Sequence, residues 1–189
     1  MKVHFIYILL IISLALPKWA NAAYVDLQSG SLMGMIHATV GDSFFDNHHF
    51  SGGMGYVPKL DNHAEMTLFS LRYRYQNPYR FNFNIKGKEL QLSPINFGTS
   101  LLYGKHSDLF LELPEQYPSG YYKPTALRII FNYQSILHIS ENTEVYFDIS
   151  VLEVGLITYV REPEFFMDNY DYLGLEGITN WGFGVRRHF

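Results

Sequence analysis

The chain of 189 residues contains no cysteine. A disulfide framework is therefore excluded, and so is catalysis by a thiol. No long apolar run follows the first residues, which excludes a membrane protein built from helices. Basic residues are few, with 14 Lys and Arg against 18 Asp and Glu, so nucleic acid is not an expected partner. The fold must then be held together by a packed core, a metal ion or a membrane.

The first residues are typical of a secretory signal peptide. A short apolar run follows Lys2, and Ala20 and Ala22 place small side chains before the expected cleavage site. We expect residues 1–22 to be removed and residues 23–189 to form one mature domain. That domain keeps 12 basic and 18 acidic side chains, for a formal charge of −6.

Aromatic residues are abundant, with 15 Tyr, 15 Phe and 2 Trp. Many alternate with polar residues, as strands do when one face meets lipid and the other a polar interior. The alternation predicts eight strands, at residues 31–41, 51–58, 65–76, 79–86, 95–104, 125–139, 143–160 and 176–189. Most approach the roughly 9 to 11 residues that a tilted strand needs to cross a bilayer. The predicted fold is all-β, an up-and-down antiparallel transmembrane β-barrel. A soluble periplasmic β-sandwich with a binding role has the same alternation and stays an alternative.

The last predicted strand has the sharpest pattern. Trp181, Phe183, Val185 and Phe189 share one face, and the chain ends on this phenylalanine. The strand resembles the final strand of small Gram-negative outer-membrane β-barrel proteins, which ends in Phe and carries a signal for the barrel-assembly machinery. Arg187 departs from that pattern, although its side chain can reach the interface from a strand end. The resemblance implies location in the outer membrane, with its lipids, lipopolysaccharide and the assembly machinery as partners.

The predicted strands also sort their connections. With both termini in the periplasm, the two longest connections face outward, as in outer-membrane barrels. The connections expected on the periplasmic side are 59–64, 87–94 and 140–142. Those expected outside are 42–50, 77–78, 105–124 and 161–175.

Residues 125–139 and 143–160 predict a hairpin with a defined register. Setting Ile139 opposite Thr143 keeps apolar residues opposite one another. Near Glu153 the alternation changes phase, for which we expect a β-bulge rather than the end of the membrane-spanning part. In this register Phe131 points outward, and the interior pairs are His138 with Glu144 and Gln134 with Asp148.

The polar faces of the strands predict a lumen filled by side chains. Eight strands enclose an interior just wide enough for this, so an open pore is not expected. The interior residues are predicted to be Arg72, Arg74, Asn82, Asn84, Lys86, Arg128, Asn132, Gln134, His138, Glu144, Asp148, Ser150 and Arg186. Because basic residues outnumber acidic ones in this set, a ligand of the lumen would be an anion.

His106, Ser107 and Asp108 stand together after the predicted strand 95–104. Two barrel enzymes that modify lipid A, the palmitoyltransferase and the 3-O-deacylase, use His and Ser at the outer mouth, and a likeness to them would imply acyl transfer or deacylation. Adjacent residues alternate faces in a strand, so the base would have to come from elsewhere, with His37 as the candidate. The surrounding motifs of those enzymes are absent, and we favour a polar loop.

Asp46, His48 and His49 could bind a divalent metal, but they lack the fixed spacing of a zinc site. We expect neither a metal nor another cofactor.

Residues 105–124 and 161–175 combine acidic and aromatic side chains. As outer loops they would form contact surfaces for an unidentified extracellular partner, or for lipopolysaccharide through bridging cations. The predicted function is a non-enzymatic outer-membrane barrel with a structural or adhesive role.

Overall fold

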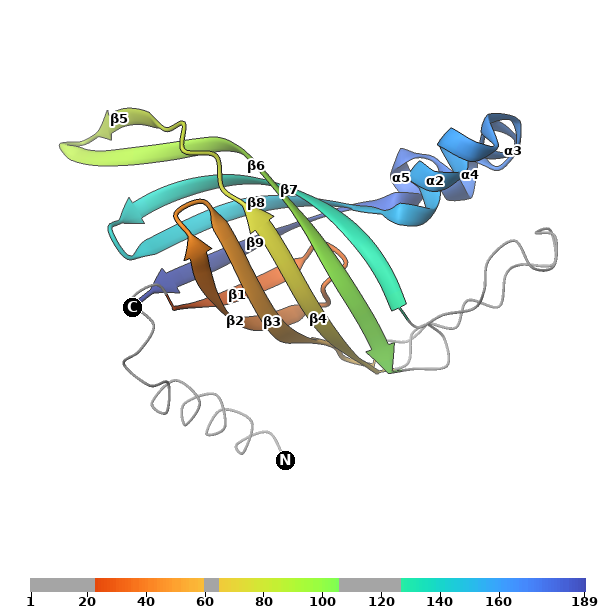
Figure 1. The fold of residues 1–189 in the computed structure, drawn as a ribbon, viewed down its shortest axis with the longest axis horizontal. Coiled ribbons are helices and arrows are strands. Elements are labelled where there is room, and N and C mark those ends of the chain that lie inside the picture. The colour runs from red at the N-terminus through yellow and green to blue at the C-terminus, as the bar shows by residue number, and fades with distance from the viewer. Residues whose placement is uncertain (1–22, 60–64, 106–126) are drawn as a thin grey trace.

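The computed structural model describes residues 23–59, 65–105 and 127–189, so the expected signal peptide lies outside the described residues. These residues form nine strands and a group of short helices (Figure 1). The strands are β1 (Tyr24–Gly30), β2 (Ile36–Phe45), β3 (His48–Val57), β4 (Met66–Tyr75), β5 (Phe81–Ile85), β6 (Lys88–Lys105), β7 (Leu127–Ser140), β8 (Thr143–Leu152) and β9 (Thr179–His188).

Eight of the nine described strands form a closed antiparallel barrel. Most pair with their neighbours in the chain, while β1 pairs with β9 and β4 pairs with β6. Tyr24 lies opposite His188, so β1 begins and β9 ends at the same end of the barrel. We call this the terminal end and the opposite one the distal end. The closed barrel confirms the predicted all-β, up-and-down fold and excludes the two packed sheets of a β-sandwich.

The strand number is as predicted, but one predicted member of the wall is wrong and one strand was missed. β1 was not expected, although Tyr24, Asp26 and Gln28 alternate inward along it. Among the described strands β5 pairs with β6 alone, and this hairpin extends beyond the wall at the terminal end (Figure 1). The predicted interior residues Asn82, Asn84 and Lys86 are therefore exposed to the surroundings.

Three connections, 42–50, 59–64 and 77–78, consequently lie at the end opposite to the predicted one. Within residues 42–50, β2 turns into β3 at the terminal end, where the N–H of Gln76 donates to the carbonyl of Asn47 over 2.9 Å. β3 ends and β4 begins at the distal end, on either side of the predicted periplasmic connection 59–64. β4 ends at the terminal end, so residues 77–78, predicted outside, follow it there. The prediction lacked β1, so it gave β2, β3 and β4 the wrong direction across the membrane. It also counted β5 as a wall strand, and this extra strand restored the correct direction from β6 onward. Later connections therefore kept their predicted ends.

The predicted register of the β7–β8 hairpin is confirmed. Gln134 pairs with Asp148 and His138 with Glu144, while Phe131 points outward and is 44% exposed. At the turn an irregularity places Ser140, in place of Ile139, opposite Thr143. The alternation of polar and apolar residues was sufficient to set this register because a slip by one residue would have turned every side chain to the wrong face.

The phase change near Glu153 marks the start of a helix and not a β-bulge. The predicted outer loop 161–175 is likewise helical. Four helices follow β8: α2 (Glu153–Arg161), α3 (Pro163–Asp168), α4 (Tyr170–Leu173) and α5 (Leu175–Ile178). We call residues 153–178 the helical unit; it lies at the distal end and buries Phe166, Leu173 and Ile178 (Figure 1). No helix in the described part of the chain is long and apolar enough to cross a membrane.

Candidate functional site: the wall, the lumen and the helical unit

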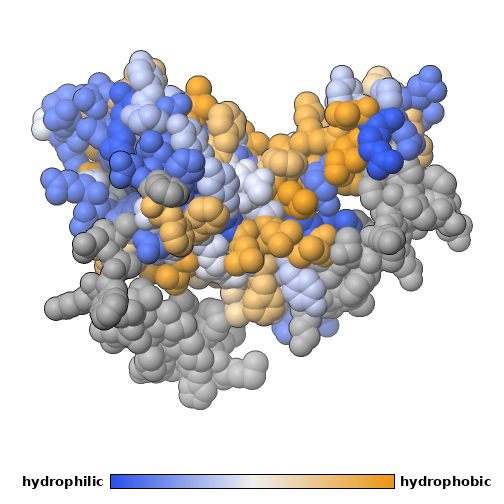
Figure 2. Space-filling view, viewed as in Figure 1, coloured by the Kyte–Doolittle hydropathy of each residue, from blue (hydrophilic) through white to orange (hydrophobic). Residues whose placement is uncertain are grey.

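Apolar side chains cover the outside of the barrel. Leu71 and Trp181 expose 66% and 62% of their surface on this wall. Aromatic rings pack side by side there, as Phe147 does with Trp181 and Phe183. Figure 2 shows hydrophobic residues gathered across the middle of the molecule, next to the hydrophilic end that carries the β5–β6 hairpin. Soluble monomers rarely expose so large a contiguous apolar surface, so this wall is suited to an apolar environment.

Arg186 is the centre of a buried charge network in the lumen. Its Nη2 and Nε donate to Oδ2 of Asp26 over 2.7 and 3.1 Å, and its Nη1 donates to Oε2 of Glu144 over 2.7 Å. The guanidinium also lies over the rings of Tyr24 and Tyr146, 5.2 and 4.8 Å from their centroids. Because Arg186 is 1% exposed, almost no solvent screens these interactions.

A second cluster surrounds Asp148 farther along the lumen. Its two carboxylate oxygens accept hydrogen bonds from Gln134, Asn132 and Ser150, over 2.6, 3.2 and 2.9 Å. Asp148 itself is 0% exposed. Hydrogen bonds from three neighbouring side chains offset much of the cost of burying this carboxylate. These contacts span β7 and β8 and fix the two strands to one another.

The predicted pair of His138 and Glu144 lies at the terminal end of the lumen. Nδ1 of His138 is 3.3 Å from Oε1 of Glu144, and His188 approaches the same oxygen to 3.4 Å. Glu144 thus links the terminal end to Arg186.

The other two predicted arginines also face inward. Arg72 donates from Nη2 to Gln28 over 2.8 Å, and Arg74 donates to Gln134 over 3.5 Å. Of the described residues, three carboxylates and three arginines are buried in this interior, namely Asp26, Glu144, Asp148, Arg72, Arg74 and Arg186. The expected excess of basic residues, and with it an anionic ligand, is therefore not supported. Asp26 was not among the predicted interior residues. Val25 and Leu27 flank it as apolar residues in alternation, and this pattern could have predicted an inward position for Asp26.

The ring of Tyr146 lies across Gly184 on the neighbouring strand. A Cβ at Gly184 would come within 2.2 Å of Cζ and Oη of this tyrosine, whose hydroxyl donates to Asp26. We expect Gly184→Ala to displace the ring and lower the free energy of unfolding by about 1 to 3 kcal/mol. Denaturant unfolding in lipid vesicles measures this. Gly52→Ala is the control, because its added Cβ meets nothing closer than 3.6 Å. Equal stability of the two variants would contradict the packing.

Arg128 lies at the distal end of β7 and not in the polar interior. Its Nη1 is 3.7 Å from Oε1 of Glu153, and each side chain is 14% exposed. Burial raises the pKa of Glu153 above its usual range, although Arg128 favours the charged form. The pair therefore joins the wall to the first residue of the helical unit, at a cost in desolvation of the carboxylate.

The raised pKa predicts a pH-dependent junction. Stability from Glu153 is present below the usual carboxyl pKa and is lost as the pH rises through the raised value. We expect Glu153→Gln to slow amide exchange in α2 at neutral pH and to have little effect at acidic pH. Hydrogen exchange at both pH values, corrected for intrinsic rates, measures this, with the exposed Glu164→Gln as control. Faster exchange in Glu153→Gln at neutral pH would contradict the assignment.

Of the candidate catalytic residues, His37 is the one that lies among the described residues. Nε2 of His37 lies 2.8 Å from Oγ of Ser70 in the lumen, and the two side chains are 1% and 5% exposed. Nδ1 of His37 has no partner among the described residues, so a third group to orient the ring is not seen there. His106, Ser107 and Asp108 lie outside the described residues, and their role stays a prediction.

The candidate metal ligands point in different directions. His48 and His49 belong to β3 and not to a loop; Nδ1 of His48 lies 2.9 Å from the Tyr73 hydroxyl, and Nδ1 of His49 lies 2.7 Å from Oγ of Ser43. Asp46 is exposed in the turn before them. The part of the chain that is described holds no cluster of three or more residues suited to a metal ion.

A closed barrel of eight antiparallel strands, apolar outside and polar within, defines the class of small outer-membrane β-barrels. The chain has the fold of this class, as the pattern of its last strand implied. Among solved structures it is similar to the N-terminal β-barrel domain of OprF from Pseudomonas aeruginosa. Sequence identity is 13% and the TM-score 0.47, over 90% of this chain and 98% of that one. A likeness of this size says nothing about function. No protein-family model and no curated protein matches the sequence.

Proposed function

We propose that this chain is an outer-membrane protein whose barrel holds the helical unit at the cell surface. The observation that carries the proposal is the combination of an apolar wall with a filled polar interior. Asp148, Arg186 and Arg74 are at most 2% exposed, so the lumen is a plug of paired side chains and not a channel. The barrel then serves as a membrane anchor, and the segments at its ends make the contacts with other molecules.

The terminal strand supports assembly into that membrane. Trp181, Phe183, Val185 and Phe189 expose between 49% and 62% of their surface, so the whole apolar face that resembles the assembly signal is accessible. Arg187 is exposed on the same face, one residue before the end of β9. We infer that this strand is the part read by the barrel-assembly machinery and that outer-membrane lipids and lipopolysaccharide surround the wall.

The helical unit is the contact surface in this proposal. Several of its apolar side chains are exposed: Val160 by 78%, Leu175 by 66% and Met167 by 64%. Glu162, Glu164 and other acidic residues lie among them, with Arg161 as the basic residue of α2. Apolar and acidic groups together suit adhesion to another surface, or contact with lipopolysaccharide through bridging cations. Residues 105–124, the second predicted contact surface, lie almost wholly outside the described residues.

The absence of cysteine allows a direct test of this placement. Val160→Cys places one thiol on α2, and Ile85→Cys places one on β5, where the side chain is 52% exposed at the opposite end. A membrane-impermeant maleimide should label Val160→Cys on intact cells and Ile85→Cys only after the outer membrane is permeabilised. The reverse pattern would place the helical unit in the periplasm and end the proposal.

The contact role itself is tested by removing the helical unit. Val151 pairs with Thr179, so an Asn-Gly turn in place of residues 153–178 can join β8 to β9. Cells with this variant should keep the barrel in the outer membrane but lose attachment to a solid surface. The control shortens the β5–β6 hairpin by the same kind of turn. Unchanged attachment of cells that carry the first variant would contradict the contact role.

A further inference from the structure

The lumen changes from polar to apolar toward the distal end. Along β4 the inward side chains pass from Arg72 to Leu68, and along β7 they pass from Asn132 to Ile130. Met33, from the turn between β1 and β2, packs in the same cluster as Leu68 and Ile130, and all three are at most 3% exposed. The polar plug therefore ends below the distal end, and aliphatic side chains line the remaining lumen.

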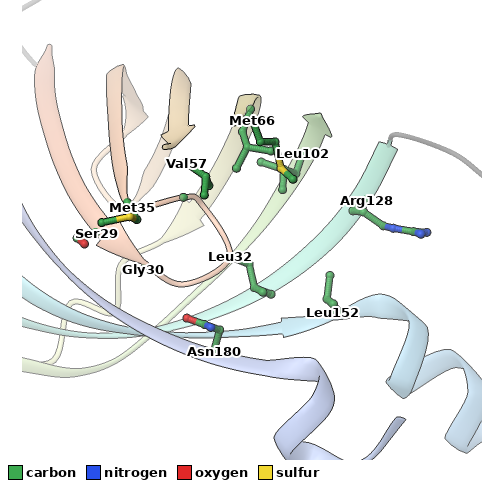
Figure 3. A pocket seen from close by; sticks show the side chains of 12 residues that line it. Ser29, Gly30, Leu32, Met35, Val57, Met66, Leu102, Arg128, Leu152 and Asn180 are labelled. Carbon is green, nitrogen blue, oxygen red and sulfur yellow. The ribbon is translucent and has the colours of Figure 1, made fainter. Parts of the chain in front are cut away.

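A cavity of about 470 Å³ opens beside this cluster (Figure 3). Its volume is within the range of small-molecule sites. Besides Leu68, its aliphatic lining consists of Leu32, Met35, Val57, Met66, Leu102 and Leu152. Ser29, Asn180 and Arg128 supply the polar groups, and the Arg128 side chain points away from the other lining residues in Figure 3. An apolar interior with a few polar groups is typical of a site for an apolar ligand with a polar end.

The turn between β1 and β2 forms the floor of the cavity. Ser31 and Met33 are 0% exposed, and Oγ of Ser31 donates to the carbonyl of Asp148 over 3.0 Å. The turn fits because Gly55 faces it: a Cβ there would come within 2.1 Å of the Met33 carbonyl oxygen. Ser31 and Leu32 have φ values of 56° and 62°, which costs strain that the packing must offset. The cavity is therefore a blind pocket that does not continue into the polar plug.

The lining indicates the kind of ligand. None of the described residues around the cavity is aromatic, in a chain whose residues are 17% aromatic. Flexible methionine and leucine side chains adapt to a slim aliphatic molecule, whereas flat rings are usually held by aromatic side chains. We propose that the cavity binds a single unbranched alkyl chain that enters from the distal end. This proposal rests on the proposed function, since membrane alkyl chains then lie close to the cavity.

Photolabelling in native outer-membrane vesicles tests the site. The probe is a single-chain alkyl carboxylate with a diazirine at the end of the chain, and labelled peptides are identified by mass spectrometry. We expect label on Met66 and Leu102, which line the cavity, and on exterior residues such as Phe131. An excess of unlabelled alkyl carboxylate should suppress the interior label alone, because the interior site saturates and the membrane does not.

Two neighbouring residues supply matched variants. Leu102→Trp fills the cavity and should lower the interior label about tenfold or more. Leu101→Trp changes the adjacent outward side chain, which is 36% exposed, and should leave the label unchanged. Met66→Trp repeats the test at a less buried position if the first variant assembles poorly. Label restricted to exterior residues, or interior label that persists in the filled variants, would overturn the site while leaving the barrel in the membrane. Absence of label on both faces would overturn the site and the proposed function together.

Discussion

Replacing Arg186 with leucine is expected to destabilise the barrel by about 3 to 5 kcal/mol. The guanidinium donates three hydrogen bonds, two to Asp26 and one to Glu144, at 2.7 to 3.1 Å. These carboxylates are 2% and 5% exposed, so neither can be solvated when the arginine is lost. The penalty comes from leaving two buried acidic groups without the guanidinium that pairs with both, and it exceeds the net contribution of the ion pairs themselves.

Arg187 provides the matched control for this prediction. It is the next residue in β9, is exposed and lies on the outer face, so Arg187→Leu should change stability by less than about 0.5 kcal/mol. Denaturant unfolding in lipid vesicles can be followed by Trp181, the one tryptophan outside residues 1–22. Similar midpoints for the two variants would show that the Arg186 network does not stabilise the barrel.

Replacing Phe131 with arginine should cost about 1 to 4 kcal/mol, because a basic residue on the lipid face is penalised by an amount that grows with its depth in the bilayer. Phe131 is 44% exposed and lies well inside β7, opposite Thr99 and Val151. In water the same change would place a charge on the surface at little cost. The destabilisation therefore arises from the membrane and not from the loss of internal packing.

Phe81 allows a comparison with the same residue type and nearly the same exposure. It is 47% exposed but belongs to the β5–β6 hairpin, outside the barrel wall. Phe81→Arg should leave stability within about 0.5 kcal/mol of the parent chain. The two variants are compared by unfolding in vesicles and by the amount assembled in cells. Equal tolerance of arginine at both positions would mean that the wall does not contact lipid.

Much of the barrel could be predicted because its two faces differ so strongly in polarity. The register of β7 and β8 follows from the requirement that Gln134, His138, Glu144 and Asp148 share the interior. The alternation of polar and apolar residues could not show that β5 lies outside the barrel wall. Alternation indicates a strand with two different faces, but it does not indicate which strand pairs with it. β1 has seven residues, begins directly after the expected cleavage site and contributes few apolar side chains, so its periodicity is weak.

The charge network and the helical unit were less accessible to sequence reasoning. Asp26 is 160 residues from Arg186, and only closure of the barrel through β1 and β9 brings them together. After Leu152 the sequence remains rich in apolar residues, which favoured the prediction of a longer strand, although helix α2 begins at Glu153. The apolar cavity depends on the inward fold of the β1–β2 turn. Ser31 and Leu32 have positive φ values there, and neither residue type predicts this backbone conformation.

Cell fractionation tests the central claim most directly. A barrel whose wall meets lipid should be recovered with the outer membrane on a density gradient, remain there after an alkaline wash and require detergent for release. The exposed apolar residues of the wall predict this result, because they could not face water without aggregation. Recovery of the folded chain in the soluble periplasm without detergent would contradict the account.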